Sequence, residues 1–177
     1  MGIIPQKLID KGRWWTKALS LVEGCTPDTP FEHVHIREDR LDIPRRTRKP
    51  QVFAVWSDLF HEQVENYFID KTIAIIEVAQ QHTFLVLTKR PIRAKNYFID
   101  RGYISAPNLW VGVTVENQEQ ADKRIPELLK IPGKKFLSVE PMLQAINIRR
   151  YLTKEYLRLL SPNHEYIEIP VINQVIC

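Results

Sequence analysis

The chain has 177 residues, a net charge of +4 and a sequence pI of about 9.1, with 44% hydrophobic and 26% charged residues. This length and composition suit one globular domain with a real core, and no apolar run approaches the roughly 20 residues that a membrane span needs. Residues Met1 to Lys11 lack a secretory signal, and Cys25 and Cys177, at opposite ends of the chain, suggest no disulfide framework. We therefore expect a cytoplasmic protein without membrane contact.

Short β-rich apolar runs alternate with helical patterns along most of the chain. Leu19–Val22 is a candidate first strand. The later runs start about 25 to 35 residues apart, which is the length of a βα unit. They are Val52–Trp56, Thr83–Leu87, Leu109–Val115, Lys135–Val139 and Val171–Ile176. Most are nearly continuously apolar, as expected for parallel strands that are buried on both faces.

Helical patterns fill the intervals between these runs. The first has one apolar face, made of Phe68, Thr72, Ile75, Ile76 and Ala79. Pro91 suits the first turn of the next helix, and Gly102 can end it. Asn117 and Gln120 form a capping pair before a third helix, which we expect Pro126 to break, to kink or to divide into two.

Alternating strands and helices predict an α/β fold with a parallel sheet and right-handed crossovers. A complete eight-fold barrel needs about 250 residues, more than this chain has. We therefore predict one truncated domain over residues 1–177, a partial (β/α) barrel of five or six strands that is incomplete at both ends. An open, doubly wound sheet is the alternative. No Gly-rich phosphate loop follows any strand, so a Rossmann or P-loop domain is not supported.

Residues 26–50 break the pattern, because they are rich in proline and charge and show no period. They occupy the place of the first crossover helix, so we expect this helix to be missing. One sheet face would then be uncovered, and either self-association through that face would cover it or the chain would be prone to aggregate. The densest basic run, Arg45, Arg46, Arg48 and Lys49, is either a solvated linker or a patch that contacts phosphate groups.

Polar residues follow the expected strands. Asp58 follows the first regular strand, Lys89 and Arg90 the second, Glu116 the third and Glu140 the fourth. Ligands bind at the carboxyl ends of parallel strands, so we predict that these residues converge on one rim suited to binding or acid–base chemistry. The alternative is structural: such residues cap helices or pair with each other, as Lys89 and Glu116 could do.

A metal site is a weaker hypothesis. His33 and His35 alternate as on a strand, and Asp58, His61 and Glu62 could add ligands. These residues do not complete a recognised metal-ligand spacing, so we predict no metal site.

Several longer motifs occur in the order and spacing of a known family. They are Asp58–Glu62, Gln81–Phe84, Leu87–Pro91, Gly112–Gln118, Ala121–Pro126 and Ser138–Pro141. From about Trp14 to Cys177, the chain resembles the phage gp thirty-seven/gp sixty-eight family of unknown function. This family is similar to radical SAM enzymes, so the resemblance implies a partial barrel and a cysteine motif near the N-terminus.

In such enzymes, three thiolates hold a [4Fe–4S] cluster that binds and cleaves S-adenosylmethionine. The family's Gly-Cys-Thr signature is present as Gly24-Cys25-Thr26, but the two cysteines expected after it are missing. Cys25 is therefore read as a remnant of the cluster motif. We expect that the chain binds neither the cluster nor S-adenosylmethionine.

Three functional hypotheses remain. The first is a degenerate radical-SAM-like enzyme, whose active chemistry is implied by the resemblance alone. The second is a non-catalytic binding module for nucleic acid or a small phosphorylated ligand. The third is a non-functional gene fragment. In the second case the rim of Asp58, Lys89, Arg90, Glu116 and Glu140 would bind the ligand. None of these motifs names a substrate or a reaction.

Overall fold

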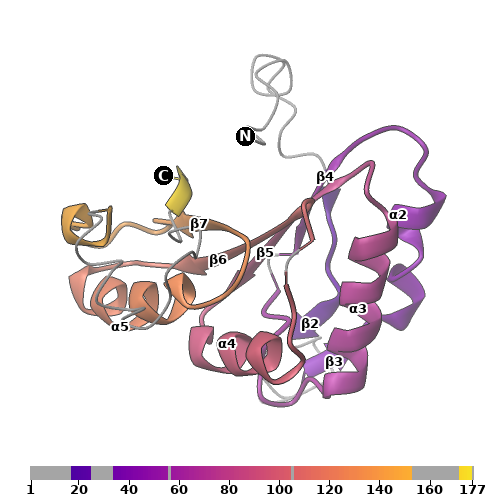
Figure 1. The fold of residues 1–177 in the computed structure, drawn as a ribbon, viewed down its shortest axis with the longest axis horizontal. Coiled ribbons are helices and arrows are strands. Elements are labelled where there is room, and N and C mark those ends of the chain that lie inside the picture. Colours follow the sequence, from indigo (N-terminus) through magenta and orange to yellow (C-terminus); the bar gives the residue numbers. More distant parts are fainter. Residues whose placement is uncertain (1–16, 25–33, 56, 105, 153–171, 177) are drawn as a thin grey trace. The chain divides into compact units, whose positions relative to one another are not determined.

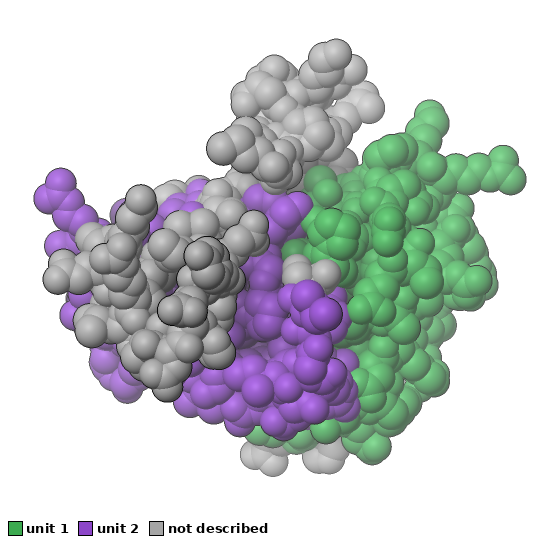
Figure 2. Space-filling view, in the orientation of Figure 1, with its two compact units in different colours: residues 1–87, 106–109 green, residues 88–105, 110–177 purple. Residues whose placement is uncertain are grey.

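The computed structural model describes residues 17–24, 34–55, 57–104, 106–152 and 172–176. The chain forms two compact units, coloured separately in Figure 2. Unit 1 comprises residues 1–87 and 106–109, and unit 2 comprises residues 88–105 and 110–177. Whether the chain is one domain stays a prediction.

Three parallel strands lie in unit 1 in the order β1-β4-β5: β1 (Lys17–Ala18), β4 (Val52–Val55) and β5 (Thr83–Thr88). Every side chain of β4 is buried, as its continuous apolar run predicts. β1 begins before the expected run Leu19–Val22, although the Leu19 amide extends the pairing by donating to the Ala54 carbonyl at 2.9 Å.

Helix α3 (Asn66–Val78) connects β4 with β5. Its buried face consists of Phe68, Ile69, Thr72, Ile73 and Ile76, close to the predicted face. The buried Asn108 side chain closes the end of α3, because its Nδ2 donates to the carbonyls of Ile76 at 2.7 Å and Ala79 at 3.2 Å. The Phe84 amide also donates to the Asn108 carbonyl at 2.8 Å. These bonds fix residues 106–109 within unit 1.

Short elements occupy part of the stretch that we expected to be irregular. β2 (Val22–Gly24) pairs with β3 (Val34–Ile36) in an antiparallel manner. The 3₁₀ helix η1 (Glu38–Arg40) and helix α2 (Ile43–Arg46) follow. Elements of three or four residues are too short to show a period, so the sequence pattern missed them. Residues 26–33 lie outside the described residues.

Unit 2 contains the strand order β6-β7-β8, all parallel: β6 (Leu109–Thr114), β7 (Lys134–Ser138) and β8 (Ile172–Ile176). All six side-chain positions of β6 are buried. Gly112 of β6 lies opposite Phe136 of β7, and a Cβ atom at Gly112 would lie 2.4 Å from the Phe136 ring. Glycine is therefore needed there for close packing of the two strands.

Two helices and a short 3₁₀ helix complete unit 2: α4 (Pro91–Asp100), α5 (Gln118–Leu129) and η2 (Arg149–Leu152). α4 ends as expected at Gly102, whose φ is +58°, and the Tyr103 amide donates to the Phe98 carbonyl at 2.9 Å in a Schellman motif.

The start of α5 also agrees with the sequence pattern, but its middle does not. Asn117 Oδ1 accepts from the Gln120 amide at 2.9 Å, which confirms the capping pair. The helix continues through Pro126 to Leu129, so the predicted break is wrong. Pro126 falls in the last turns, where the buried side chains Ile125 and Leu128 hold the helix against the fold.

The predicted α/β class is confirmed, because each unit has parallel strands that alternate with helices (Figure 1). β4 to β8 fall on the apolar runs that the sequence shows. Within the ranges that the structure describes, no helix has the length and apolar character needed to cross a membrane.

Candidate functional site

Three charged side chains of unit 2 meet next to the carboxyl ends of two strands. Lys89, which follows β5, and Glu116, which follows β6, form an ion pair with 3.2 Å between Nζ and Oε1. Arg124 of α5 approaches from the other side, with Nη1 2.8 Å from Glu116 Oε2. Each carboxylate oxygen of Glu116 therefore holds one cation. The ion pair is the structural alternative that the sequence left open.

The members of this cluster differ in exposure. The side chains of Glu116 and Arg124 are 13% and 14% exposed, whereas that of Lys89 is 56% exposed. Arg124 Nη1 also donates to the Thr114 carbonyl at 2.6 Å, which fixes the guanidinium against the end of β6. The pair of Glu116 and Arg124 is therefore held in place by these contacts. Lys89 is the member of the cluster that solvent or a ligand can reach.

The carboxyl group of Glu116 is held in its charged form. Burial alone raises the pKa of Glu116, but its own backbone amide, Lys89 and Arg124 outweigh burial and lower this pKa below 4.5. A carboxylate that stays ionised near neutral pH is a poor general acid. The arrangement suits the positioning of cations better than proton transfer.

Arg90 stands beside Lys89 at the start of α4. Its amide donates to Thr88 Oγ1 at 2.9 Å, and Pro91 begins the helix directly after it. The N-terminus of a helix carries partial positive charge and unpaired amides, which together attract anions. Two cationic side chains and this helix end are thus adjacent at the carboxyl end of β5.

The other two predicted rim residues are not in this cluster. Glu140 follows β7, is exposed, and makes no hydrogen bond or ion pair with any of the described residues. The loop that contains Glu140 is nevertheless tied to the cluster, because the Leu143 amide donates to the Glu116 carbonyl at 2.9 Å. Asp58 belongs to unit 1, where its Oδ1 accepts from the Phe60 amide at 3.2 Å in the turn after β4. Its participation in the rim stays a prediction.

The residues present do not fit the iron–sulfur cluster that the resemblance implies. Such a cluster needs three thiolates, and the chain has two cysteines, Cys25 and Cys177. Both lie outside the described residues, as does His33. Among the residues that are described, no three His, Cys, Asp or Glu side chains could together hold a metal ion. His61 instead accepts from the Gln63 amide at 3.2 Å.

A second polar network, which the sequence did not reveal, lies at the start of α5. Tyr151 Oη donates to Asp122 Oδ1 at 2.5 Å, and burial together with Asp122 raises the pKa of Tyr151 to about 12. Gln118 exchanges two hydrogen bonds with the backbone of Asn147, at 2.7 and 3.2 Å. A cavity of about 500 Å³ lies here, lined by Gln118, Asp122, Asn147, Arg149 and Arg150. Partners 29 residues apart leave no local sequence signal.

Parallel strands alternating with helices, and a half-buried carboxylate that holds two cations at the strand ends, define an α/β protein with a candidate ligand-binding rim. A family model described as a protein of unknown function, DUF5131, matches residues 11–177. The chain belongs to the DUF5131 family. Neither a curated protein nor a solved structure matches the chain significantly.

Proposed function

We propose that this DUF5131 protein is of the phage gp thirty-seven/gp sixty-eight type and keeps the ligand rim of a radical-SAM-like barrel without the cluster chemistry. The ordered motifs that contain Arg90, Glu116 and Glu140 support this assignment. The cysteine count argues against cluster binding, because two thiolates cannot replace three. The protein is then a binding protein rather than a radical enzyme.

We propose further that the rim binds a phosphate group. The observation that carries this proposal is the cluster in which the half-buried Glu116 holds Arg124 and the exposed Lys89. Arg90 and the start of α4 add positive charge beside Lys89. Among the rim and cluster residues of unit 2, Lys89, Arg90 and Arg124 give three positive charges, against two negative charges from Glu116 and Glu140. A phosphate group is accordingly favoured over a cationic ligand.

Fluorescence anisotropy with a labelled mononucleotide, a single-stranded RNA and a duplex DNA tests this proposal. Substituting Lys89→Ala removes a charge-assisted hydrogen bond worth about 1.5 kcal/mol, so binding should weaken about tenfold. Lys123→Ala is the matched control, because Lys123 is also exposed (65%) and paired with a glutamate, Glu119, at 2.6 Å. Equal effects of the two substitutions would refute the role of the rim.

The same titrations separate the two sources of phosphate. Binding of a nucleic acid releases counterions, so its affinity should fall steeply with salt, whereas a mononucleotide shows a shallow dependence. If none of the three probes binds, or if inorganic phosphate does not compete with the mononucleotide, the phosphate proposal is wrong.

A separate measurement tests whether the chain has lost the iron–sulfur cluster. After anaerobic reconstitution, we expect the chain to contain no stoichiometric iron or sulfide. About four irons and four sulfides per chain would show an intact [4Fe–4S] site and overturn this part of the proposal.

Thermal unfolding followed by circular dichroism addresses the remaining alternative, a non-functional fragment. We expect a cooperative and reversible transition, as for a folded domain. A broad or absent transition would favour the fragment and would remove the basis for a ligand-binding function.

A further inference from the structure

Unit 1 contains a groove between α2 and the last turns of α3. Its volume is about 440 Å³, and its lining residues are Arg45, Ala74, Ile75, Val78, Ala79 and Gln81. The floor is apolar and belongs to α3, and Val78 at the end of this helix is 67% exposed. An apolar floor that stays open to solvent is a feature of peptide-binding grooves.

A buried histidine fixes the α2 wall of the groove. His82, which is 2% exposed, accepts from the Gln51 amide through Nδ1 at 3.1 Å. Its Nε2 donates to the Pro44 carbonyl at 2.9 Å, since a carbonyl can only accept. The ring thereby ties the chain within and after α2 to the start of β5. The groove is preformed, which reduces the entropy cost of binding.

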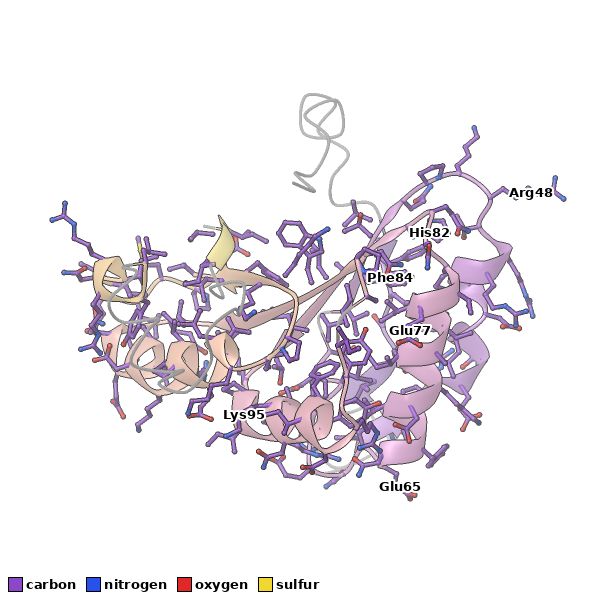
Figure 3. All side chains as sticks on the ribbon, viewed as in Figure 1. Arg48, Glu65, Glu77, His82, Phe84 and Lys95 are labelled. Atoms are coloured by element: carbon purple, nitrogen blue, oxygen red, sulfur yellow. The ribbon has the colours of Figure 1, made fainter. Side chains whose placement is uncertain are left out.

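Arg45 of the basic run lines the groove, and the other basic residues of the run lie in or directly after α2. Arg45 and Arg46 share Asp42, with separations of 3.4 and 3.3 Å. Arg48 and Lys49 are exposed and make no hydrogen bond or ion pair with any described residue. Figure 3 shows Arg48 pointing away from the fold.

Acidic groups near the groove do not cancel this charge. Besides Asp42, the last turn of α3 contributes the exposed Glu77 (Figure 3). The basic run contributes four cations against these two carboxylates. The surroundings of the groove are therefore positive, and they complement a negatively charged partner.

We propose that this groove docks a peptide segment of a partner protein in which apolar side chains are flanked by aspartate or glutamate. The apolar side chains would cover Val78 and Ile75, and the acidic ones would pair with Arg48 and Lys49. A nucleic acid would use the cations but would gain nothing from an aliphatic floor. This groove adjoins the amino ends of β4 and β5, marked by Gln51 and His82, so the proposal is independent of the rim.

A randomised peptide library displayed on yeast, selected on the full chain, provides the test. We expect the enriched peptides to combine leucine or aromatic residues with aspartate or glutamate. Val78→Gln should weaken their binding about tenfold, since it removes an apolar contact worth about 1.5 kcal/mol. The double substitution Arg48→Glu and Lys49→Glu should have a similar or larger effect. All three residues are exposed, so these variants should fold normally, which circular dichroism verifies.

Matched controls lie in unit 2. Ile92 of α4 is 59% exposed and apolar, and Arg149 is exposed and cationic, so Ile92→Gln and Arg149→Glu should leave peptide binding unchanged. The proposal is refuted if no peptides are enriched, or if binding is insensitive to the groove variants. A further outcome would assign the basic run to nucleic acid instead. In that case no peptides are enriched, and duplex DNA binds the wild type and the Val78→Gln variant but not the charge-reversal variant.

Discussion

Lys135 provides the sharpest test of the packing in unit 2. It lies on β7 and is 1% exposed, and its Nζ donates to the Gly133 carbonyl at 2.7 Å. Burial of the ammonium lowers the pKa of Lys135 from 10.5 to about 8. We predict that Lys135→Met stabilises the protein at neutral pH, because methionine fills a similar volume without the buried charge.

The magnitude follows from the two pKa values. The difference between 10.5 and about 8, at about 1.4 kcal/mol per pH unit, corresponds to a cost of about 3 kcal/mol for the charged folded state. Loss of the hydrogen bond to Gly133 returns about 1 kcal/mol. Because Gly133 is exposed, water can replace this donor. The net gain expected for Lys135→Met near neutral pH is therefore about 2 kcal/mol.

The pH dependence of stability that Lys135 causes is opposite to that of a lysine with an acidic partner. Below about pH 8, Lys135 is protonated in both the folded and the unfolded state, and the folded state carries the whole cost of burying the charged ammonium. Between about 8 and 10.5 the unfolded state binds more protons, so the stability of the wild type rises with pH. The advantage of Lys135→Met should shrink across this window and disappear near its upper end.

Urea unfolding followed by circular dichroism, at steps from neutral pH to about 10.5, measures this difference. Lys134→Met is the control, because Lys134 is only half-buried and its ammonium lies over the Trp110 ring at 5.5 Å from the centroid. The control removes a lysine from the same strand without removing a buried charge, so it should bring no gain in stability at neutral pH. A Lys135→Met variant that is less stable than the wild type at neutral pH, or a constant difference, would refute the reasoning.

Three further predictions concern packing, a buried hydrogen-bonded ring and the charged cluster. Gly112→Ala should lower the free energy of unfolding by about 1 to 3 kcal/mol in urea titrations, because its Cβ meets the Phe136 ring. A second substitution, Phe136→Leu, should restore part of this loss. An unchanged free energy of unfolding for Gly112→Ala would contradict the close contact. His82→Phe keeps a ring but removes both hydrogen bonds, so we expect the free energy of unfolding to fall by about 2 kcal/mol and peptide binding to the groove to weaken. Unchanged stability would show that the hydrogen bonds of His82 do not fix the wall of the groove. Glu116→Gln leaves the charge of Arg124 unbalanced and should cost about 2 kcal/mol near neutral pH. Since the pKa of Glu116 is lowered on folding, this cost should vanish as the pH falls below that pKa, and a cost that persists in acid would contradict it.

The fold was largely predictable from the sequence where elements are long and buried. The strands β4 and β6 consist of continuous apolar runs, and such runs have few alternatives to a buried parallel strand. Helix ends with side-chain caps or a left-handed glycine, as at Asn117 and Gly102, were also readable. The hairpin β2–β3 and helix α2 were not, because they depend on contacts distant in sequence rather than on a local period.

The candidate site was predictable in part for the same reason. The topology of parallel strands brings Lys89 and Glu116 together, and their positions after strands were visible in the sequence. Arg124 was missed because it lies on a helix, beside the apolar stripe, where a surface role is the ordinary expectation. The buried position of His82 could not be read from the sequence, because its ring is bonded to Pro44, 38 positions earlier in the chain.

The place of Asn108 has a consequence for dividing this protein into parts. Residues 106–109 complete unit 1, yet the chain enters unit 2 before it reaches them. A fragment that stops at Leu87 would lack the Asn108 side chain that caps the Ile76 carbonyl of α3, and the backbone carbonyl that pairs with the Phe84 amide. The two units are thus interleaved along the chain, and during synthesis the first cannot mature until part of the second has been made.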